Sequence, residues 1–188
     1  MHQARRNRWA RKRGEVSGER KDAPRPFLPG HPLAVEPSIK ASWGPGPWQK
    51  EPEFWEGDAA GFRVQALRHC ALGCLNGYLR VPPGHPWHGE NVDDLVDVDT
   101  HGGVSYAEGE PGGDGWIVGF DTAHGGDAWP GKFAHKVTCF RSDPNVPSEL
   151  EKALEGLPDP LGLNNDEYRD LAFVQEALKA LAEQARNA

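Results

Sequence analysis

Two short segments of the chain combine aspartate, histidine and glycine in nearly the same order. The first is VDVDTHGGVSY from Val96 to Tyr106, and the second is VGFDTAHGGD from Val118 to Asp127. In each segment an apolar run ends in Asp-Thr, and a histidine then precedes two glycines. Glycine reaches positive φ and lets a ligand approach backbone N–H groups, while aspartate orients a neighbouring imidazole. The two motifs together predict a shared ligand-binding site.

The predicted site draws on both motifs and on the Pro-rich loop before them. Its ligand-binding residues are expected to be His85, His101, Gly102, Gly103, Asp121, His124, Gly125 and Asp127. Three of them, Asp121, His124 and Asp127, are spaced by three on one loop and could hold a divalent metal ion. Trp87 or Trp129 could stack on a ring of the ligand. The sequence has no HExxH motif and no paired CxxC, so a metal ion is an alternative here and no cofactor is assigned.

Two other interpretations of these residues stay open. Asp-Thr and Gly-Gly are common turn residues, whose side chains cap local backbone groups. Cys74 or Cys139 with a histidine could form a nucleophile pair, although isolated cysteines are usually small core residues. The sequence lacks the GxSxG, Walker A and Rossmann motifs, so it assigns no catalytic residue and leaves open whether the protein is an enzyme.

Alternating apolar and polar residues predict the strands that would position the motifs. Strands are expected over about 62–68 and 74–81, joined by a turn at 69–73. A further strand is expected over 95–100, where Leu95, Val96 and Val98 alternate with acidic residues.

A hairpin is predicted to bring the two histidine motifs together. Its strands, 104–107 and 116–120, flank the turn-rich segment 108–115. If Ala107 faces Trp116 across an antiparallel ladder, His101 and Thr122 lie side by side just past its end. The sequence therefore predicts that both motifs meet at one end of one hairpin.

The C-terminal part of the chain is expected to be helical. Ser148 and Glu151 form a capping-box pattern that opens a short helix, and a short strand is expected before it at 136–140. Asp166 is expected to cap the last helix. That helix carries apolar residues at helical spacing, which are Tyr168, Leu171, Val174, Leu178 and Leu181.

Charge divides the chain into an arm and a body. Residues 1–26 carry nine Lys/Arg against three Asp/Glu, although the whole chain has a net charge of −7. Residues 1–40 are expected to be a disordered basic and Pro-rich arm, either a solvated tail or a contact for nucleic acid. The Trp-rich segment 43–57 is expected to form a flap over a sheet face, with a platform on which a base could stack as the alternative.

Residues 41–188 are expected to form a single α+β domain. A small, mainly antiparallel sheet over about 60–140 would carry the C-terminal helix packed on it, within a helical part at 148–186. The three cysteines form no disulfide framework, and the sequence shows neither a secretory signal nor an apolar stretch of membrane length. These features predict a cytoplasmic protein without a membrane partner.

Four segments together resemble a family of uncharacterised small proteins encoded by bacteriophages and prophages. They are GYLRVPPGHP (77–86), HGG (101–103), WIVGFDTAHGGD (116–127) and YRD (168–170). The chain departs from the family pattern at Thr122, where cysteine is frequent, and this disfavours a Cys/His nucleophile there. The resemblance implies a phage or prophage accessory protein that acts in the cytoplasm of a bacterial host.

The sequence therefore supports three functional hypotheses. The first is an accessory protein that binds a small polar or nucleotide-like ligand at the His/Asp/Gly site. The second is a metal-dependent hydrolase that uses the same residues. The third is an adaptor that binds nucleic acid or a host protein through residues 1–26.

Overall fold

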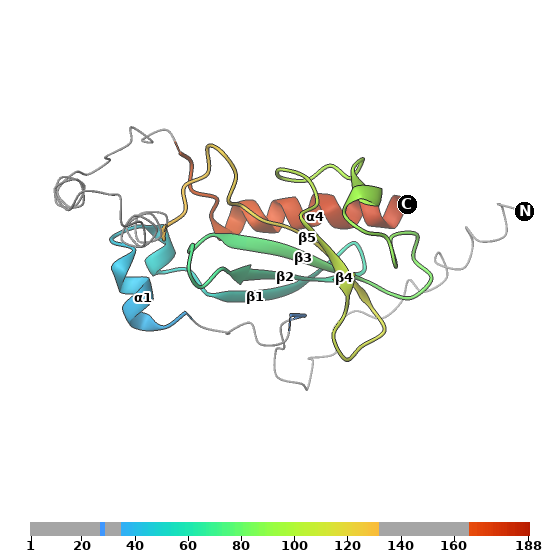
Figure 1. The fold of residues 1–188 in the computed structure, drawn as a ribbon, viewed down its shortest axis with the longest axis horizontal. Helices are drawn as coiled ribbons and strands as arrows, with labels where there is room; N and C mark the ends of the chain where they lie inside the picture. The colour runs from blue at the N-terminus through green and yellow to red at the C-terminus, as the bar shows by residue number, and fades with distance from the viewer. Residues whose placement is uncertain (1–26, 29–34, 132–165) are drawn as a thin grey trace, which may run out of the picture.

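A five-stranded antiparallel sheet with a long helix against one face forms the core of the protein (Figure 1). The computed structural model describes residues 27–28, 35–131 and 166–188. The strands lie in the order β1-β2-β3-β5-β4, and the expected α+β architecture is confirmed. The elements in chain order are α1 (Pro37–Ser42), η1 (Pro47–Gln49), β1 (Phe54–Ala59), β2 (Phe62–Arg68), β3 (Leu75–Val81), η2 (Asp93–Leu95), β4 (Tyr106–Gly109), β5 (Trp116–Phe120) and α4 (Leu171–Asn187).

Two tight connections set the register of the first three strands. Ala60 and Gly61 join β1 to β2 with φ of 49° and 92°, the conformation of a primed two-residue hairpin turn. Between β2 and β3, the Gly73 N–H donates to the carbonyl of His69 at 2.8 Å, and Gly73 has φ of 74°. The predicted turn at 69–73 is thus confirmed.

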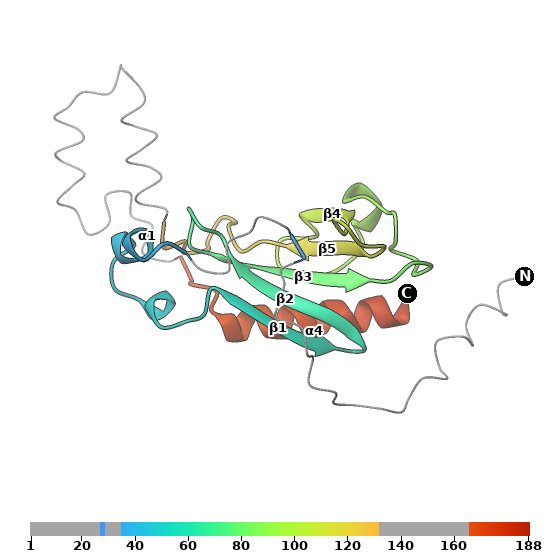
Figure 2. The ribbon, with the colours of Figure 1, turned by 90° about the horizontal axis from the view of Figure 1, so that it is seen from below.

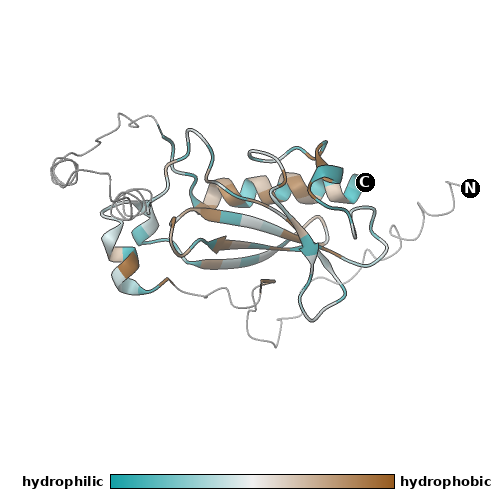
Figure 3. Cartoon of the chain, viewed as in Figure 1, coloured by the Kyte–Doolittle hydropathy of each residue, from teal (hydrophilic) through white to brown (hydrophobic). Residues whose placement is uncertain are grey.

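Helix α4 packs along one face of the sheet, as the turned view shows (Figure 2). The apolar residues that recur along it (Figure 3) include five that are buried, namely Val174, Leu178, Leu181, Ala182 and Ala185. The helix packs closely on β3 at Gly77, where a Cβ would lie 3.1 Å from the Leu178 side chain. The apolar stripe predicted for this helix is core packing.

The opposite face of the sheet carries a second, smaller apolar cluster. Leu67, Tyr78 and Ile117 are buried there under Phe27. The Phe27 N–H also donates to Gln65 Oε1 at 2.7 Å, and the Arg63 guanidinium lies over its ring. A residue of the predicted arm therefore contributes to the folded core.

Within residues 1–40, the prediction of disorder is wrong for Phe27 and for residues 37–40. Glu36 caps the first turn of α1, because its carboxylate accepts the Ser38 N–H at 2.8 Å. Residues 1–26 and 29–34 lie outside the described residues. The Trp-rich segment predicted to be a flap contains η1 and the start of the edge strand β1, so the sheet begins at 54 rather than at about 60.

The strand expected over 95–100 is not formed. The Asn91 side chain accepts the N–H groups of Asp93 and Asp94, which favours the helical turn η2, and the chain continues through turns. Val96, one of the apolar residues behind that prediction, is 79% exposed. The predicted strand at 136–140 and the helix that begins near 148 lie outside the described residues.

The β4–β5 hairpin differs from the predicted register by two residues. Gly109 rather than Ala107 faces Trp116, because the Glu110 N–H donates to the Gly115 carbonyl and closes a shorter turn. Residue numbers across this ladder sum to 225, as for Tyr106 and Gly119. His101 and His124 satisfy the same sum, so the corrected register points the two motifs more directly at each other.

A buried ion-pair network fixes the start of α4 against the sheet. Arg68, whose side chain is fully buried, pairs with Glu51 and Glu53 and donates to the Tyr168 hydroxyl. Tyr168 donates to Glu51 at 2.5 Å, and burial together with this hydrogen bond raises the pKa of Tyr168. The helix is capped by Asp170, not by Asp166, because Asp170 accepts the Phe173 N–H at 2.8 Å.

Candidate functional site

Asp127 is the centre of a cluster at the end of the β4–β5 hairpin. Its side chain is 2% exposed, and its two oxygens accept three hydrogen bonds. Oδ2 accepts from His101 Nε2 at 2.7 Å and from the His124 backbone N–H at 3.0 Å, while Oδ1 accepts from Arg169 Nε at 2.9 Å. A carboxylate only accepts, so His101 Nε2 carries the proton in this contact.

These hydrogen bonds determine the charge of Asp127. Burial alone would raise the pKa of its carboxyl, but the three hydrogen bonds outweigh burial and hold the pKa below its ordinary value. Asp127 is therefore an anionic carboxylate at neutral pH. A buried anion needs cationic or N–H partners, and the Arg169 guanidinium is one of those that the structure supplies.

His101 is placed in the cluster by the turn that follows it. Gly102 and Gly103 have φ of 69° and 89°, as the sequence led us to expect, and the Gly103 N–H donates to the Thr100 carbonyl. The imidazole of His101 packs edge to face against the rings of His124 and Phe173, with both centroid distances 5.2 Å. The ring is thus held between the second motif and the first turn of α4.

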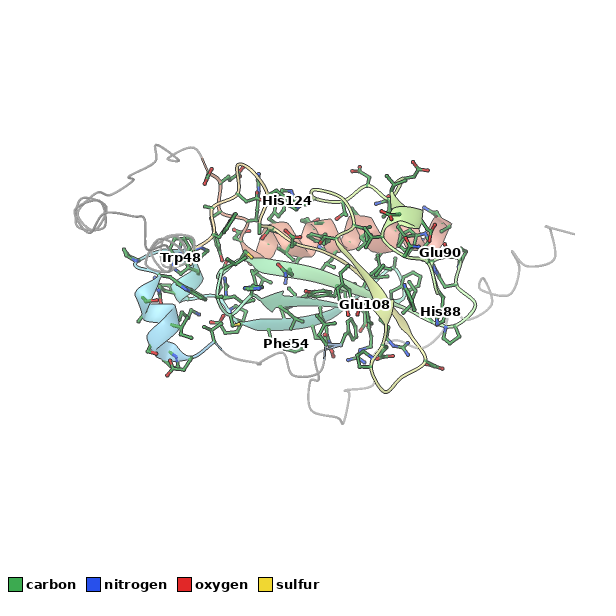
Figure 4. All side chains as sticks on the ribbon, viewed as in Figure 1. Trp48, Phe54, His88, Glu90, Glu108 and His124 are labelled. Carbon is green, nitrogen blue, oxygen red and sulfur yellow. The ribbon has the colours of Figure 1, made fainter. Side chains whose placement is uncertain are left out.

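His124 lies directly against the backbone of the first motif. A Cβ on Gly102 would lie 2.2 Å from His124 Cε1 and Nε2, so only glycine leaves room for this ring. Its Nδ1 is buried and 3.5 Å from Asp127 Oδ2, without a hydrogen bond. Its Nε2 is 3.7 Å from Asp121 Oδ1. Figure 4 shows His124 above the end of the sheet that is far from His88.

Arg169 is a residue of the cluster that the sequence did not predict. It reaches Asp127 from just before α4, bonds Glu167 through Nη1 at 2.6 Å and lies over the Phe173 ring. A parallel bridge between Asp127 and Glu167 brings this segment alongside the second motif. The only sequence signal for Arg169 is its place in the YRD segment of the family resemblance.

His85 was predicted in the site, and the structure places it elsewhere. Its Nε2 is 2.8 Å from the Ala185 carbonyl in the last turn of α4, and its Nδ1 accepts the Trp87 N–H at 3.0 Å. Phe173, which contacts His101, lies twelve residues earlier in the helix, about 18 Å along its axis. Burial lowers the pKa of His85, so it is a neutral residue that caps the helix.

Other predicted site residues have a local or structural role. Gly125 is exposed, and the positive φ of 92° in this loop belongs to Gly126. Trp87 is buried in the core and cannot stack on a ligand. Burial raises the pKa of the Cys74 thiol to about 12, which disfavours it as a nucleophile, and Cys139 lies outside the described residues.

The cluster has the donor set of a transition-metal site. One nitrogen of His101, one of His124 and one oxygen of Asp127 lie within 4.8 Å of one another. With bonds near 2.1 Å, the ligand atoms of a tetrahedral zinc ion lie about 3.4 Å apart, so the 3.5 Å between His124 Nδ1 and Asp127 Oδ2 fits. His101 would exchange its hydrogen bond to Asp127 for a metal bond. The predicted set had Asp121 in place of His101, and Asp121 instead approaches the other nitrogen of His124.

Comparisons with protein-family models, curated proteins and solved structures found no match for this chain. No helix in the described part of the chain combines the length and apolar character that a membrane crossing needs. The phage resemblance, the cytoplasmic location and a nucleic-acid contact through residues 1–26 stay predictions from the sequence.

Proposed function

We propose that the protein binds one divalent transition-metal ion through His101, His124 and Asp127, and that the ion offers a coordination position to a small polar ligand. Three segments distant in the sequence, namely the two histidine motifs and residues 167–173, converge on this point. Such convergence is more than local turn chemistry requires, because a turn residue needs partners only within its own loop.

The observation that carries the proposal is the buried Nδ1 of His124. This nitrogen faces a carboxylate oxygen at 3.5 Å without a hydrogen bond between them. When Nδ1 carries the lone pair, its contact with the anionic oxygen is repulsive, and a buried polar atom without a partner costs about 1–3 kcal/mol. A cation bound by both atoms removes the repulsion and uses both lone pairs.

The donor types determine which ions fit. Two imidazoles and one carboxylate suit zinc, cobalt and related ions, whereas magnesium and calcium prefer sites made of oxygen atoms. Arg169 bonds the other oxygen of Asp127 and would hold the carboxylate in place during binding. Three protein ligands leave at least one position of a zinc-like ion for a ligand from solution.

Metal titration of the full chain tests the proposal. Protein freed of metal by a chelator is titrated with zinc and with cobalt by calorimetry, alongside His101→Ala, His124→Ala and the control His88→Ala. His88 is an apt control because its Nε2 contacts the Asp114 carbonyl at the other end of the sheet. We expect one site per chain, at least tenfold weaker in the first two variants and unchanged in the third. Equal affinities for all four proteins would refute the proposal.

A metal-dependent hydrolase is the second candidate function. The open position favours it, because a divalent ion bound by three protein ligands can activate water. Zinc-loaded and metal-free protein are compared for hydrolysis of bis(p-nitrophenyl) phosphate and p-nitrophenyl acetate. Turnover that requires zinc and is lost in His124→Ala would support hydrolysis, whereas equal background rates would leave binding alone.

A further inference from the structure

The imidazole of His124 lies between two carboxylates, one at each ring nitrogen. Asp127 Oδ2 is 3.5 Å from Nδ1, and Asp121 Oδ1 is 3.7 Å from Nε2. A neutral imidazole has one N–H and one lone pair, so only one of the two carboxylates can accept a hydrogen bond from it. Which nitrogen carries the proton decides which nitrogen is free to bind a metal ion.

The Asp121 carboxylate is anchored by its own loop. Its Oδ1 accepts the Ala123 N–H at 3.0 Å. The intervening Thr122 is buried, and its hydroxyl donates to the Leu75 carbonyl on β3 at 2.8 Å. The position of Asp121 is therefore set by the sheet and the turn, independently of any ion.

The two carboxylates differ in how much acceptor capacity is already used. Asp127 is almost fully buried and accepts hydrogen bonds from His101, His124 N–H and Arg169. The side chain of Asp121 is 32% exposed, and the hydrogen bond that the structure shows for it within the described residues comes from Ala123. Asp121 is thus the better acceptor for the remaining imidazole proton.

We propose that Asp121 is a positioning residue that accepts the Nε2–H of His124 and thereby directs the Nδ1 lone pair at the metal ion. The inference rests on the metal site proposed above and specifies the ligand atom within it. Closing the Asp121 contact from 3.7 Å to a hydrogen bond of about 2.9 Å needs a small tilt of the ring. Metal binding at Nδ1 favours this tilt, because it strengthens the opposite N–H as a donor.

The backbone of Gly102 packs against the ring edge of His124 that contains Nε2. An added Cβ there would overlap Cε1, Nε2 and Cδ2 of His124, so this edge of the ring lies close against the Gly102 backbone. A flip of the ring would place carbon atoms where the two nitrogens now lie, so the observed orientation is the one that sets Nδ1 opposite Asp127 and Nε2 opposite Asp121. Carboxylates that hold the free N–H of a metal-bound histidine typically contribute 10–100-fold to metal affinity.

The test compares Asp121→Asn with Asp97→Asn in the full chain. Asp97 is an exposed acid in the loop after η2, so its variant controls for the loss of one negative charge. Zinc affinity is measured by competition with a chelating indicator, and the nitrogens of His124 are observed by long-range ¹H–¹⁵N NMR. We expect Asp121→Asn to bind zinc 10–100-fold more weakly and Asp97→Asn to match the wild type. In the wild type, the metal-free spectrum should show the Nε2–H tautomer, and zinc should shift Nδ1. If Asp121→Asn does not fold, Asp121→Ser replaces it, since a serine can still accept the Ala123 N–H.

Each outcome bears on one proposal. Wild-type zinc affinity in Asp121→Asn, or a zinc-induced shift at Nε2 instead of Nδ1, overturns the role of Asp121 while the metal site stands. Failure of the wild type to bind either zinc or cobalt overturns the metal site itself. A loss of affinity in Asp121→Asn accompanied by a mixture of His124 tautomers supports the positioning role, because a purely structural effect would leave the tautomer unchanged.

Discussion

Replacing Gly102 with alanine would disrupt the proposed metal site without changing any ligand. The new Cβ would lie 2.2 Å from two atoms of the His124 ring, whereas ordinary contact begins at 3.4 Å. The ring must therefore move by about 1.2 Å, several times the tolerance of about 0.2 Å for a metal–ligand distance. Because His124 can no longer share the ion with Asp127, we expect zinc affinity to fall at least tenfold, or about 1.4 kcal/mol.

Gly103→Ala is the matched control for this variant. Gly103 also has positive φ, 89° compared with 69° for Gly102, but a Cβ there would meet no atom within 4 Å. Both variants should lose about 1–2 kcal/mol of stability, because alanine is strained at positive φ. Urea unfolding measures this shared cost, and zinc competition measures the difference between them. If Gly102→Ala binds zinc as tightly as Gly103→Ala, the ring of His124 does not form part of a metal site.

Three further predictions concern stability and pH. Leu178→Ala, at a fully buried position of α4, should lower the free energy of unfolding in urea by about 2–5 kcal/mol, whereas the exposed Lys179→Ala should change it by less than about 0.5 kcal/mol. The pKa of His85 is lowered in the folded protein, so the unfolded chain binds more protons and the free energy of unfolding should fall as the pH drops below about 6.5. In His85→Gln, the urea midpoint of unfolding should depend less on pH between pH 7.5 and 5.5 than in the wild type. Asp127 has a lowered pKa in the folded protein, so its contribution to the free energy of unfolding should be present above about pH 4 and be lost as the pH falls through its folded-state pKa. Arg169→Gln should raise the pKa of Asp127 in a carboxyl NMR titration, and the stability of this variant should fall less on acidification.

Local patterns predicted most of the sheet but not its first strand. Alternating side chains identified β2 and β3, and glycine-bounded apolar residues identified β5. In β1, Glu56, Gly57 and Asp58 are poor strand formers, and the strand exists because the Ala60–Gly61 turn folds it onto β2. At 95–100 the local pattern favoured a strand, but the chain forms a helical turn and further turns there. The alternation was real, but Asn91 and the acidic residues after it satisfy their backbone locally.

The part of the site that lies on the hairpin could be predicted, because local sequence patterns determine it. The motif Asp-Thr-(Ala)-His-Gly-Gly occurs twice around one hairpin, and this correctly predicted that His101 and His124 are neighbours, even though the register was two residues off. Arg169 and Phe173 could not be found in this way, because tertiary packing of α4 brings them to the site and no periodic pattern links them to Asp127. His85 was misassigned because a buried histidine that caps a helix has the same sequence appearance as a ligand.

Asp127 joins three stretches of chain that are adjacent only when α4 is docked on the sheet. A synthetic peptide of either histidine motif would therefore lack the complete ligand set. Conversely, an ion that binds only the assembled site would stabilise the folded chain. At a free ion concentration one hundred times the dissociation constant, it would raise the free energy of unfolding by about 2.7 kcal/mol. A rise in melting temperature on addition of metal would therefore show that α4 is docked on the sheet as well as that the ion is bound.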